Sequence, residues 1–258
     1  MVRNPLADPY LLGVSSGASV GAVAVLAFGA LASAGMYALT AGAFAGALAA
    51  TVAVYLLARS QGRIHATRLI LGGVAIGYVL AGVTSLITLS SGQRDLANAL
   101  LTWTLGSLAG TQWEELGIPA AVLAAGMLWL GLQTRPLNAL LAGDEAATTL
   151  GVDTARLRRA LFLAVSLLTG TMVAVSGAIG FVGLIVPHAA RMLVGTDHRR
   201  VLPVAALAGA LLLVLVDLVA RTAFAPMELP GGVITSLIGG PFFVWMLVRQ
   251  PVQGGRGP

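Results

Sequence analysis

The sequence contains no cysteine and no lysine, and it holds few charges of either sign. Without cysteine the chain forms neither disulfides nor thiolate metal sites. Without lysine it cannot carry a Walker A loop, because that phosphate-binding loop requires a Gly-Lys-Ser/Thr sequence. Any ATP that drives this protein is therefore bound and hydrolysed by a separate subunit. We predict a chain with no enzymatic activity, no metal site and no cofactor of its own.

The scarcity of charge goes with a large excess of apolar residues. Of the 258 residues, 57% are hydrophobic and 10% are charged, which is far from the composition of a soluble domain. A membrane-spanning helix needs roughly 20 apolar residues. It pairs its own backbone N–H and C=O groups, because the hydrocarbon of the membrane offers no hydrogen-bond partners. The composition therefore predicts an all-α, polytopic transmembrane helix bundle. It forms one domain, residues 1–258, in contact with membrane lipid.

The basic residues are fifteen arginines, which occur in short clusters between the apolar runs. A nucleic-acid-binding surface would need a continuous basic face, so we predict no nucleic-acid partner. Cytoplasmic loops of membrane proteins carry an excess of basic residues. We therefore expect the arginine clusters to lie on the cytoplasmic side.

Seven apolar runs are long enough, or nearly long enough, to cross a membrane. They cover residues 11–31, 37–58, 69–89, 116–132, 161–181, 202–220 and 233–248. Seven spans would leave the basic residues at 198–200 outside, against the positive-inside rule. We therefore predict an eighth, short helix over residues 184–194, in a region that Gly177, Gly180, Gly183 and Pro187 break. The seven-span arrangement stays open as an alternative.

With eight spans, both termini and twelve arginines are cytoplasmic. The twelve are Arg3, Arg59, Arg63, Arg68, Arg135, Arg156, Arg158, Arg159, Arg199, Arg200, Arg249 and Arg256. Arg94 and Arg221 then face the outside. This arrangement predicts a multi-pass protein of the bacterial inner membrane.

A weak internal repeat favours a transporter over a receptor. The triplets Gly-Gly-Val at residues 72–74 and 231–233 both precede apolar stretches, and the predicted topology makes those two spans run in opposite directions. Inverted repeats of this kind build many transporters. Chance recurrence among 33 glycines is the alternative interpretation.

The segment 136–155 is too polar to lie in the membrane, and we predict a short exposed helix there. It reads Asp144-Glu145-Ala146-Ala147, then three residues, then Gly151. Gly151 can end the helix in a left-handed cap, and the small alanines would let another protein approach closely. The pattern is similar to the EAA loop with which ABC importer permeases dock on their ATPase subunits.

Three further segments carry a more specific resemblance. They are residues 3–15, which include Asn4-Pro5-Leu6-Ala7-Asp8-Pro9, residues 180–199, which include Gly180, Gly183, Pro187, His188 and Arg191, and residues 228–233, which include Gly231 and Gly232. In order and spacing they resemble the FecCD type of ABC importer permease, which takes up iron-siderophore, haem or cobalamin complexes. The resemblance covers essentially the whole chain.

The resemblance implies an inverted-repeat permease fold and a set of partners. These are two ATPase subunits, a periplasmic or lipoprotein substrate-binding protein, and a second permease copy in a homodimer or a heterodimer. The chain would form the translocation path by alternating access. We expect an iron-siderophore substrate, with haem and cobalamin as the nearest alternatives.

Two residues near the outer end of a span are candidates for contact with the binding protein. Asp217 and Arg221 are spaced i, i+4 and can pair on one helical face. The resemblance implies that Arg221 meets an acidic residue of the binding protein, which would steer docking. Alternatively, Asp217 and Arg221 only neutralise each other and contact no partner. Residues 90–113, with two interfacial tryptophans, are expected to form a short lid region on this side.

The remaining candidates are assigned structural or gating roles. His188 and Arg191 are expected to fix the short helix, because the other two histidines lie in cytoplasmic loops and one imidazole cannot build a metal site. Asn4, Pro5, Asp8 and Pro9 are expected to shape a helix end. Gly231 and Gly232 open the last span.

Members of the resembled family are usually longer, with two further spans before the Asn-Pro-Leu-Ala-Asp-Pro segment. A late start assignment, a fragment or a degenerate copy would each account for this difference. Two other functions therefore stay open. One is a truncated paralogue that does not transport, and the other is an ion-driven secondary transporter, for which Asp217 is the candidate carboxylate.

Overall fold

The computed structural model describes residues 10, 13–60, 63–64 and 66–249. Eight apolar helices dominate these residues, five of them long and apolar enough to cross a membrane and three shorter. The long ones are α2 (Ala38–Ala58, preceded by the 3₁₀ turn η2, Ala32–Tyr37), α3 (Ala66–Ser91), α5 (Gly117–Leu132, preceded by η3, Trp113–Glu115), α8 (Thr154–Ser176) and α10 (His198–Thr222). The shorter ones are α1 (Val14–Phe28), α9 (Val182–Val194) and α11 (Gly231–Arg249).

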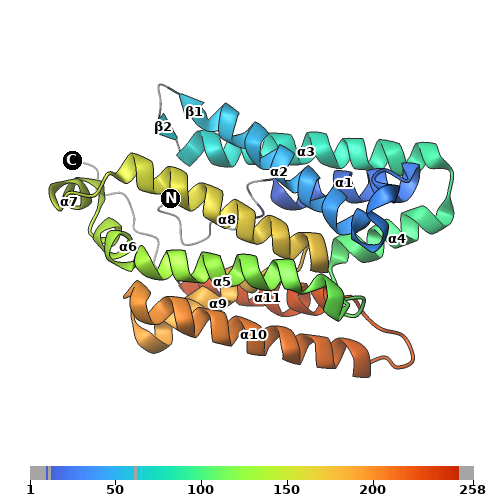
Figure 1. Cartoon of the computed structure of the whole chain (residues 1–258). Helices are drawn as coiled ribbons and strands as arrows, with labels where there is room; N and C mark the ends of the chain where they lie inside the picture. The colour runs from blue at the N-terminus through green and yellow to red at the C-terminus, as the bar shows by residue number, and fades with distance from the viewer. Residues whose placement is uncertain (1–9, 11–12, 61–62, 65, 250–258) are drawn as a thin grey trace.

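Smaller elements join these helices (Figure 1). They are the two-residue strands β1 (Arg59–Ser60) and β2 (Arg63–Ile64), and the helices α4 (Arg94–Leu105), α6 (Thr134–Leu141) and α7 (Asp144–Thr149). The predicted all-α fold is confirmed. Each of the seven predicted runs corresponds to one apolar helix, and the short helix predicted at 184–194 is α9.

Several predicted spans differ from the helices in their limits, and two of these differences have a clear local cause. The run 161–181 is α8, which begins seven residues earlier, because Asp153 accepts a hydrogen bond from the backbone N–H of Arg156 and caps the helix before its basic first turns. It ends at Ser176, because Gly177 follows with φ 68°. Within the described part of the run 11–31, α1 is 15 residues long and is followed by Gly29 in the left-handed conformation.

The most extensive contact between two described helices is that between α1 and α2. A Cβ atom on Gly21 would overlap the backbone of Gly42, and one on Gly17 would overlap the backbone of Gly46. Small residues at such crossings let two apolar backbones approach closely, which is how helices associate without a hydrophobic driving force. Buried alanines and valines of α1, α2 and α8 continue this contact into the main core.

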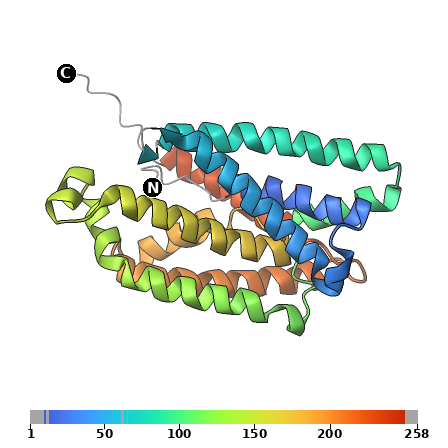
Figure 2. The same ribbon diagram turned by 45° about the horizontal axis from the view of Figure 1, so that its top comes forward.

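Few residues of α3, α5 and α10 are buried, whereas α2 and α8 are much more buried. Figure 2 shows α3 and α5 on opposite outer sides of the bundle. Exposed side chains along α3 include Leu71, Tyr78, Val79, Leu86 and Leu89. Such surfaces require lipid or another protein to cover them.

The bundle has two chemically different ends. Figure 1 shows α6, α7, the β1–β2 hairpin and the starts of α8 and α10 at one end, which we call the α7 end. The α3–α4 turn and the C-terminal end of α10 lie at the opposite end. The elements of the α7 end carry Arg59, Arg63, Arg68, Arg135, Arg156, Arg158, Arg159, Arg199 and Arg200, whereas those of the opposite end carry Arg94 and Arg221.

Candidate coupling and docking sites

The segment 136–155 folds as predicted, into a short helix at the surface of the α7 end. Gly143, with φ 111°, turns the chain from α6 into α7. After α7, the N–H of Gly151 donates to the carbonyl of Thr148 at 2.9 Å, and the N–H of Val152 donates to the carbonyl of Ala147 at 3.0 Å. This pair of bonds is the Schellman motif, and Gly151 adopts the required left-handed conformation with φ 81°. The predicted cap is confirmed.

The faces of α7 are not equivalent. Glu145, Thr148 and Thr149 are exposed, Ala146 is half-buried, and Ala147 is fully buried against its own chain. The expectation that both alanines present a surface to a partner is therefore wrong for Ala147. The small side chain of Ala147 lets this six-residue helix lie close against the bundle. The surface left for a partner is acidic and polar, and Glu145 is its charged residue.

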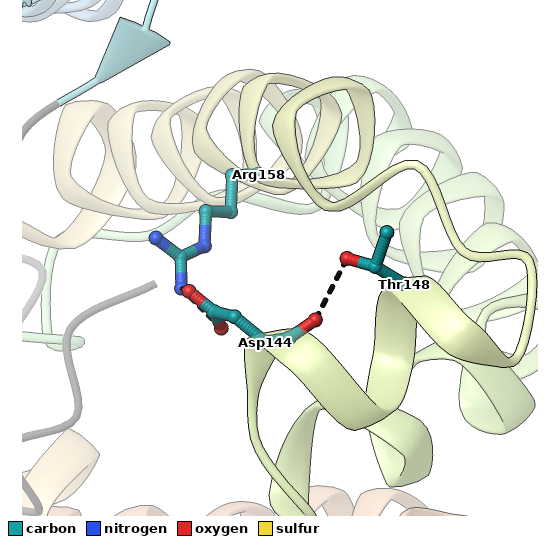
Figure 3. A network of polar contacts seen from close by, with 3 residues as sticks. All are labelled: Asp144, Thr148 and Arg158. Carbon is teal, nitrogen blue, oxygen red and sulfur yellow. Dashed lines mark hydrogen bonds and ion pairs between the residues drawn. The ribbon is translucent and has the colours of Figure 1, made fainter.

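An ion pair joins α7 to α8 (Figure 3). Nη2 of Arg158 donates to both carboxylate oxygens of Asp144 at 2.8 Å, and the backbone carbonyl of Asp144 accepts from Oγ1 of Thr148 at 2.7 Å. The Arg158 side chain is three-quarters buried. Charge-assisted bonds of this kind are stronger than neutral ones, so α7 is held to the start of α8 by a directed contact. The sequence placed Arg158 among the cytoplasmic arginines but did not predict its pairing with Asp144, because a separation of 14 residues across a turn follows no helical spacing.

A second polar contact joins α6 to the start of α10. Nδ2 of Asn138 donates to Oδ1 of Asp197 at 2.6 Å, and Oδ1 of Asn138 accepts from the backbone N–H of His198 at 2.9 Å. Nδ1 of His198 also lies 2.7 Å from that oxygen and must carry the hydrogen, because an amide oxygen can only accept. Asp197 in turn caps α10 by accepting from the N–H of Arg199 at 3.0 Å. Nothing in the sequence pattern pointed to Asn138.

This contact predicts an acid-dependent change in stability. The backbone N–H of Arg199 and the Asn138 amide hold the pKa of Asp197 below its ordinary value of 3.8. A carboxyl with a depressed pKa stabilises the fold above its unfolded pKa and loses this contribution as the pH falls through the folded value. The Tm advantage of the wild type over Asp197→Asn should therefore shrink below about pH 4. A difference in Tm that does not change with pH would contradict the assignment.

The opposite end of the bundle carries the predicted Asp217–Arg221 pair. Nε of Arg221 donates to Oδ2 of Asp217 at 2.8 Å, with both side chains partly exposed. The i, i+4 pairing is confirmed. The guanidinium keeps an exposed edge, because 43% of the Arg221 side chain is accessible to solvent. The lid region includes the separate helix α4, and a cavity of about 620 Å³ lies between α4 and the loop before α11, lined in part by Trp103, Ser107 and Glu228.

The break between α8 and α9 depends on Gly177, as expected, and on Phe181, which was not expected. Gly177 and Phe181 have positive φ, whereas Gly180 does not, and Gly183 lies within α9. Pro187 also lies inside α9, which continues through it. The expectation that Gly183 and Pro187 interrupt the helix is therefore wrong, because the chain already turns before Val182.

The other structural candidates fall into three groups. The ring of His188 packs edge-on against the ring of Phe242 in α11, with 6.1 Å between the ring centroids. Arg191 lies in the last turn of α9, where the helix dipole favours a cation. Asn4, Pro5, Asp8 and Pro9 lie outside the described residues. Gly231 and Gly232 begin α11, as predicted.

Gly232 is the point where α11 meets α4. Its N–H donates to the carbonyl of Gly106 at 3.1 Å, and a Cβ atom on it would overlap the carbonyl oxygen of Leu105. By contrast, Gly72 lies inside α3, which begins at Ala66, so the resemblance between the two Gly-Gly-Val triplets does not extend to helix starts. The two helices do run in opposite directions (Figure 1).

Comparison with known proteins decides the family. The sequence profile of the FecCD transport family matches residues 1–249. The chain belongs to the FecCD transport family. FecCD proteins are permease subunits of ABC transporters, in which ATP hydrolysis belongs to a separate subunit, so this chain is not an enzyme. The resemblance drawn from the motifs is thereby confirmed.

Individual FecCD relatives are named for different substrates. The cobalamin import permease BtuC of Halobacterium salinarum is 47% identical over 97% of this chain and 66% of its own length. The hemin transport permease HmuU of Yersinia pestis is 43% identical over 98% of this chain and 76% of its own. A solved chain described as a metal-chelate type ABC transporter in an inward-facing conformation superposes with a TM-score of 0.85 at 32% identity, over 96% of this chain and 78% of that one. The chain thus spans about two thirds to three quarters of the length of these relatives.

Proposed function

We propose that this chain is a transmembrane permease subunit of an ATP-driven importer for a metal chelate or corrinoid, such as an iron-siderophore complex, haem or cobalamin. The observation that carries the proposal is the position of α7. It is a short, acidic, exposed helix at the arginine-rich end of the bundle, and Arg158 ties it to α8. An ATPase subunit that holds such a helix can move the bundle behind it.

The charge distribution sets the orientation of the proposed permease. Because cytoplasmic ends of membrane proteins are enriched in arginine, the α7 end is cytoplasmic and the Arg221 end faces the outside. An even number of spans would then place both termini in the cytoplasm. The ATPase subunits dock on the α7 end, and the substrate-binding protein docks on the end that carries Arg221.

The exposed apolar faces suggest how the rest of the surface is used. The side of α3 that carries Leu71, Tyr78 and Leu86 is too large an apolar area to face water. Membrane lipid and a second permease copy, most simply in a homodimer, cover these faces. Alternating access then follows if ATP binding moves the two α7 helices relative to one another.

An ion-driven mechanism has less support. Its candidate carboxylate, Asp217, accepts a hydrogen bond from Arg221 and lies near one end of α10. An ion pathway would need a carboxylate free to exchange its partner near the midplane of the bundle.

The proposal is tested by reconstitution in liposomes with the cognate ATPase and binding protein. Uptake of cyanocobalamin, hemin and a ferric siderophore is measured with ATP and with a non-hydrolysable analogue. Uptake of one class that requires hydrolysis supports the proposal. Absence of ATP-dependent uptake of all three would contradict the proposed substrate classes, and an ATPase that does not associate with the chain would contradict the permease role.

Arg221 gives a prediction about the outer partner. Arg221→Glu should weaken binding of the substrate-binding protein about tenfold, because it replaces an attractive charge at the docking surface with a repulsive one next to Asp217. Arg94→Glu makes the same change at the other arginine of that end and serves as the matched control. Affinity is measured with the purified binding protein at low and high salt. Equal losses in the two variants would contradict a specific role for Arg221.

A further inference from the structure

We propose that Asn138 is a positioning residue that transmits movement of the coupling segment, residues 134–151, into α10. The proposal rests on the proposed function, because it assumes that an ATPase subunit moves α7. It assigns to Asn138, Asp197 and His198 a mechanical role that their sequence positions do not reveal.

The coupling segment is one packed unit with two separate attachments. Within it, the N–H of Gly143 donates to the carbonyl of Leu140 at 3.2 Å, so α6 and α7 are joined by a tight turn. Arg158 and Asp144 attach the unit to α8, and Asn138 attaches it to the start of α10. A displacement of α7 is therefore divided between two helices that lie on different sides of α5 (Figure 1).

The second attachment is better suited to carry a force than a single hydrogen bond. Asn138 uses both ends of its amide, so it holds the side chain of Asp197 and the backbone and ring of His198 together. These two residues are the cap and the first residue of α10. Since α10 is a continuous helix of 25 residues, a movement at its start reaches Asp217 and Arg221 at its far end.

A purely local role for Asn138 is less consistent with the contacts. The cap of α10 is already formed by Asp197, whose side chain accepts from the N–H of Arg199 without help from Asn138. The amide of Asn138 adds a link between two elements separated by 59 residues in sequence. Its contribution is therefore the connection between α6 and α10.

The geometry allows a test by exchange of partners. In Asn138→Asp two carboxylates would face each other where the hydrogen bond of 2.6 Å now lies, and like charges repel. In Asp197→Asn the amide of Asn138 still has an oxygen to donate to. In the double variant Asn138→Asp/Asp197→Asn the like charges are removed, and residue 197 can donate to the new carboxylate, which still accepts from His198. The cost is the cap bond to Arg199, because Oδ1 of Asp197 accepts from both Asn138 and the N–H of Arg199 in the wild type. Asn98→Asp, at an exposed asparagine of α4, is the matched control.

The readout is a cysteine placed at Ala223, directly after α10, in this naturally cysteine-free chain. In the reconstituted complex with ATPase subunits, we measure how ATP and vanadate change its rate of labelling by a maleimide. We expect a clear change in the otherwise wild-type chain, in Asp197→Asn and in Asn98→Asp. The change should fall about tenfold in Asn138→Asp and return in the double variant.

The outcomes separate the two proposals. If nucleotide does not alter labelling in the otherwise wild-type chain, the proposed function and the inference both fail. If it does, and Asn138→Asp responds equally, the inference alone is overturned. It is also overturned if the double variant responds no better than Asn138→Asp.

Discussion

Reversing the charge of Glu145 should uncouple the importer. In Glu145→Arg, ATP-dependent uptake and transport-stimulated ATP hydrolysis are expected to fall by at least about tenfold, because an acidic contact in the docking surface becomes repulsive. Insertion and folding should be unaffected, since the side chain is exposed and no described hydrogen bond uses its carboxylate. The measurements are uptake, ATPase rate and the amount of ATPase subunit that co-purifies with the permease.

Glu114→Arg is the matched control for this experiment. Glu114 is another exposed glutamate, but it belongs to η3 at the start of α5, and only its backbone carbonyl accepts a described hydrogen bond. The amount of co-purified ATPase should stay near the wild-type level in this variant. Unchanged uptake and ATPase association in Glu145→Arg would remove α7 from the coupling role.

The second large effect concerns stability at the junction of α4 and α11. Gly232→Ala should destabilise the bundle by about 2 kcal/mol, because the new methyl group would displace the carbonyl of Leu105 and strain the bond from Gly232 to Gly106. Gly240→Ala lies on the same helix with open space around its Cβ position, so it should be neutral or slightly stabilising. Thermal unfolding in detergent compares the two variants. A similar Tm for both would mean that α11 is not held at this junction.

The junction of α4 and α11 also includes the break between α8 and α9. Gly106, Gly177 and Gly232 lie where α4, the α8–α9 break and α11 meet, and Ser107 also donates its N–H to the carbonyl of Ser176 at 2.8 Å. Three chain breaks thus share one contact point. Broken backbone inside a membrane protein needs partners for its freed groups, and the bonds from Gly232 to Gly106 and from Ser107 to Ser176 provide them here.

The fold was predictable because its signals are local. Apolar runs of the required length mark the helices, and Gly151 marks a helix end for the reason that only glycine readily adopts its conformation. The limits of α8 were missed for a local reason too. Its first turns carry arginines that look like loop residues until Asp153 is recognised as their cap.

The sequence identified the charged residues of the candidate sites but not all of their partners, because some partners are distant in sequence and meet only in the folded chain. Asp144, Glu145, Asp217 and Arg221 stand out as charges in an apolar chain. Asn138, by contrast, is one polar residue in an ordinary amphipathic helix, and its partner is 59 residues away. Helical spacing relates residues three or four apart, so it can find the Asp217–Arg221 pair and cannot find this one.

The central claim is that α7 and the end of α10 that carries Arg221 lie on opposite sides of the membrane, with α7 facing the ATPase. Single cysteines at Thr149 and at Ala223 can be labelled with a membrane-impermeant maleimide in right-side-out and inside-out vesicles. The account predicts that the cysteine at 149 reacts only in inside-out vesicles and is protected by bound ATPase, whereas the cysteine at 223 reacts only in right-side-out vesicles. Reaction of both from the same side, or of position 149 from the outside, would contradict it.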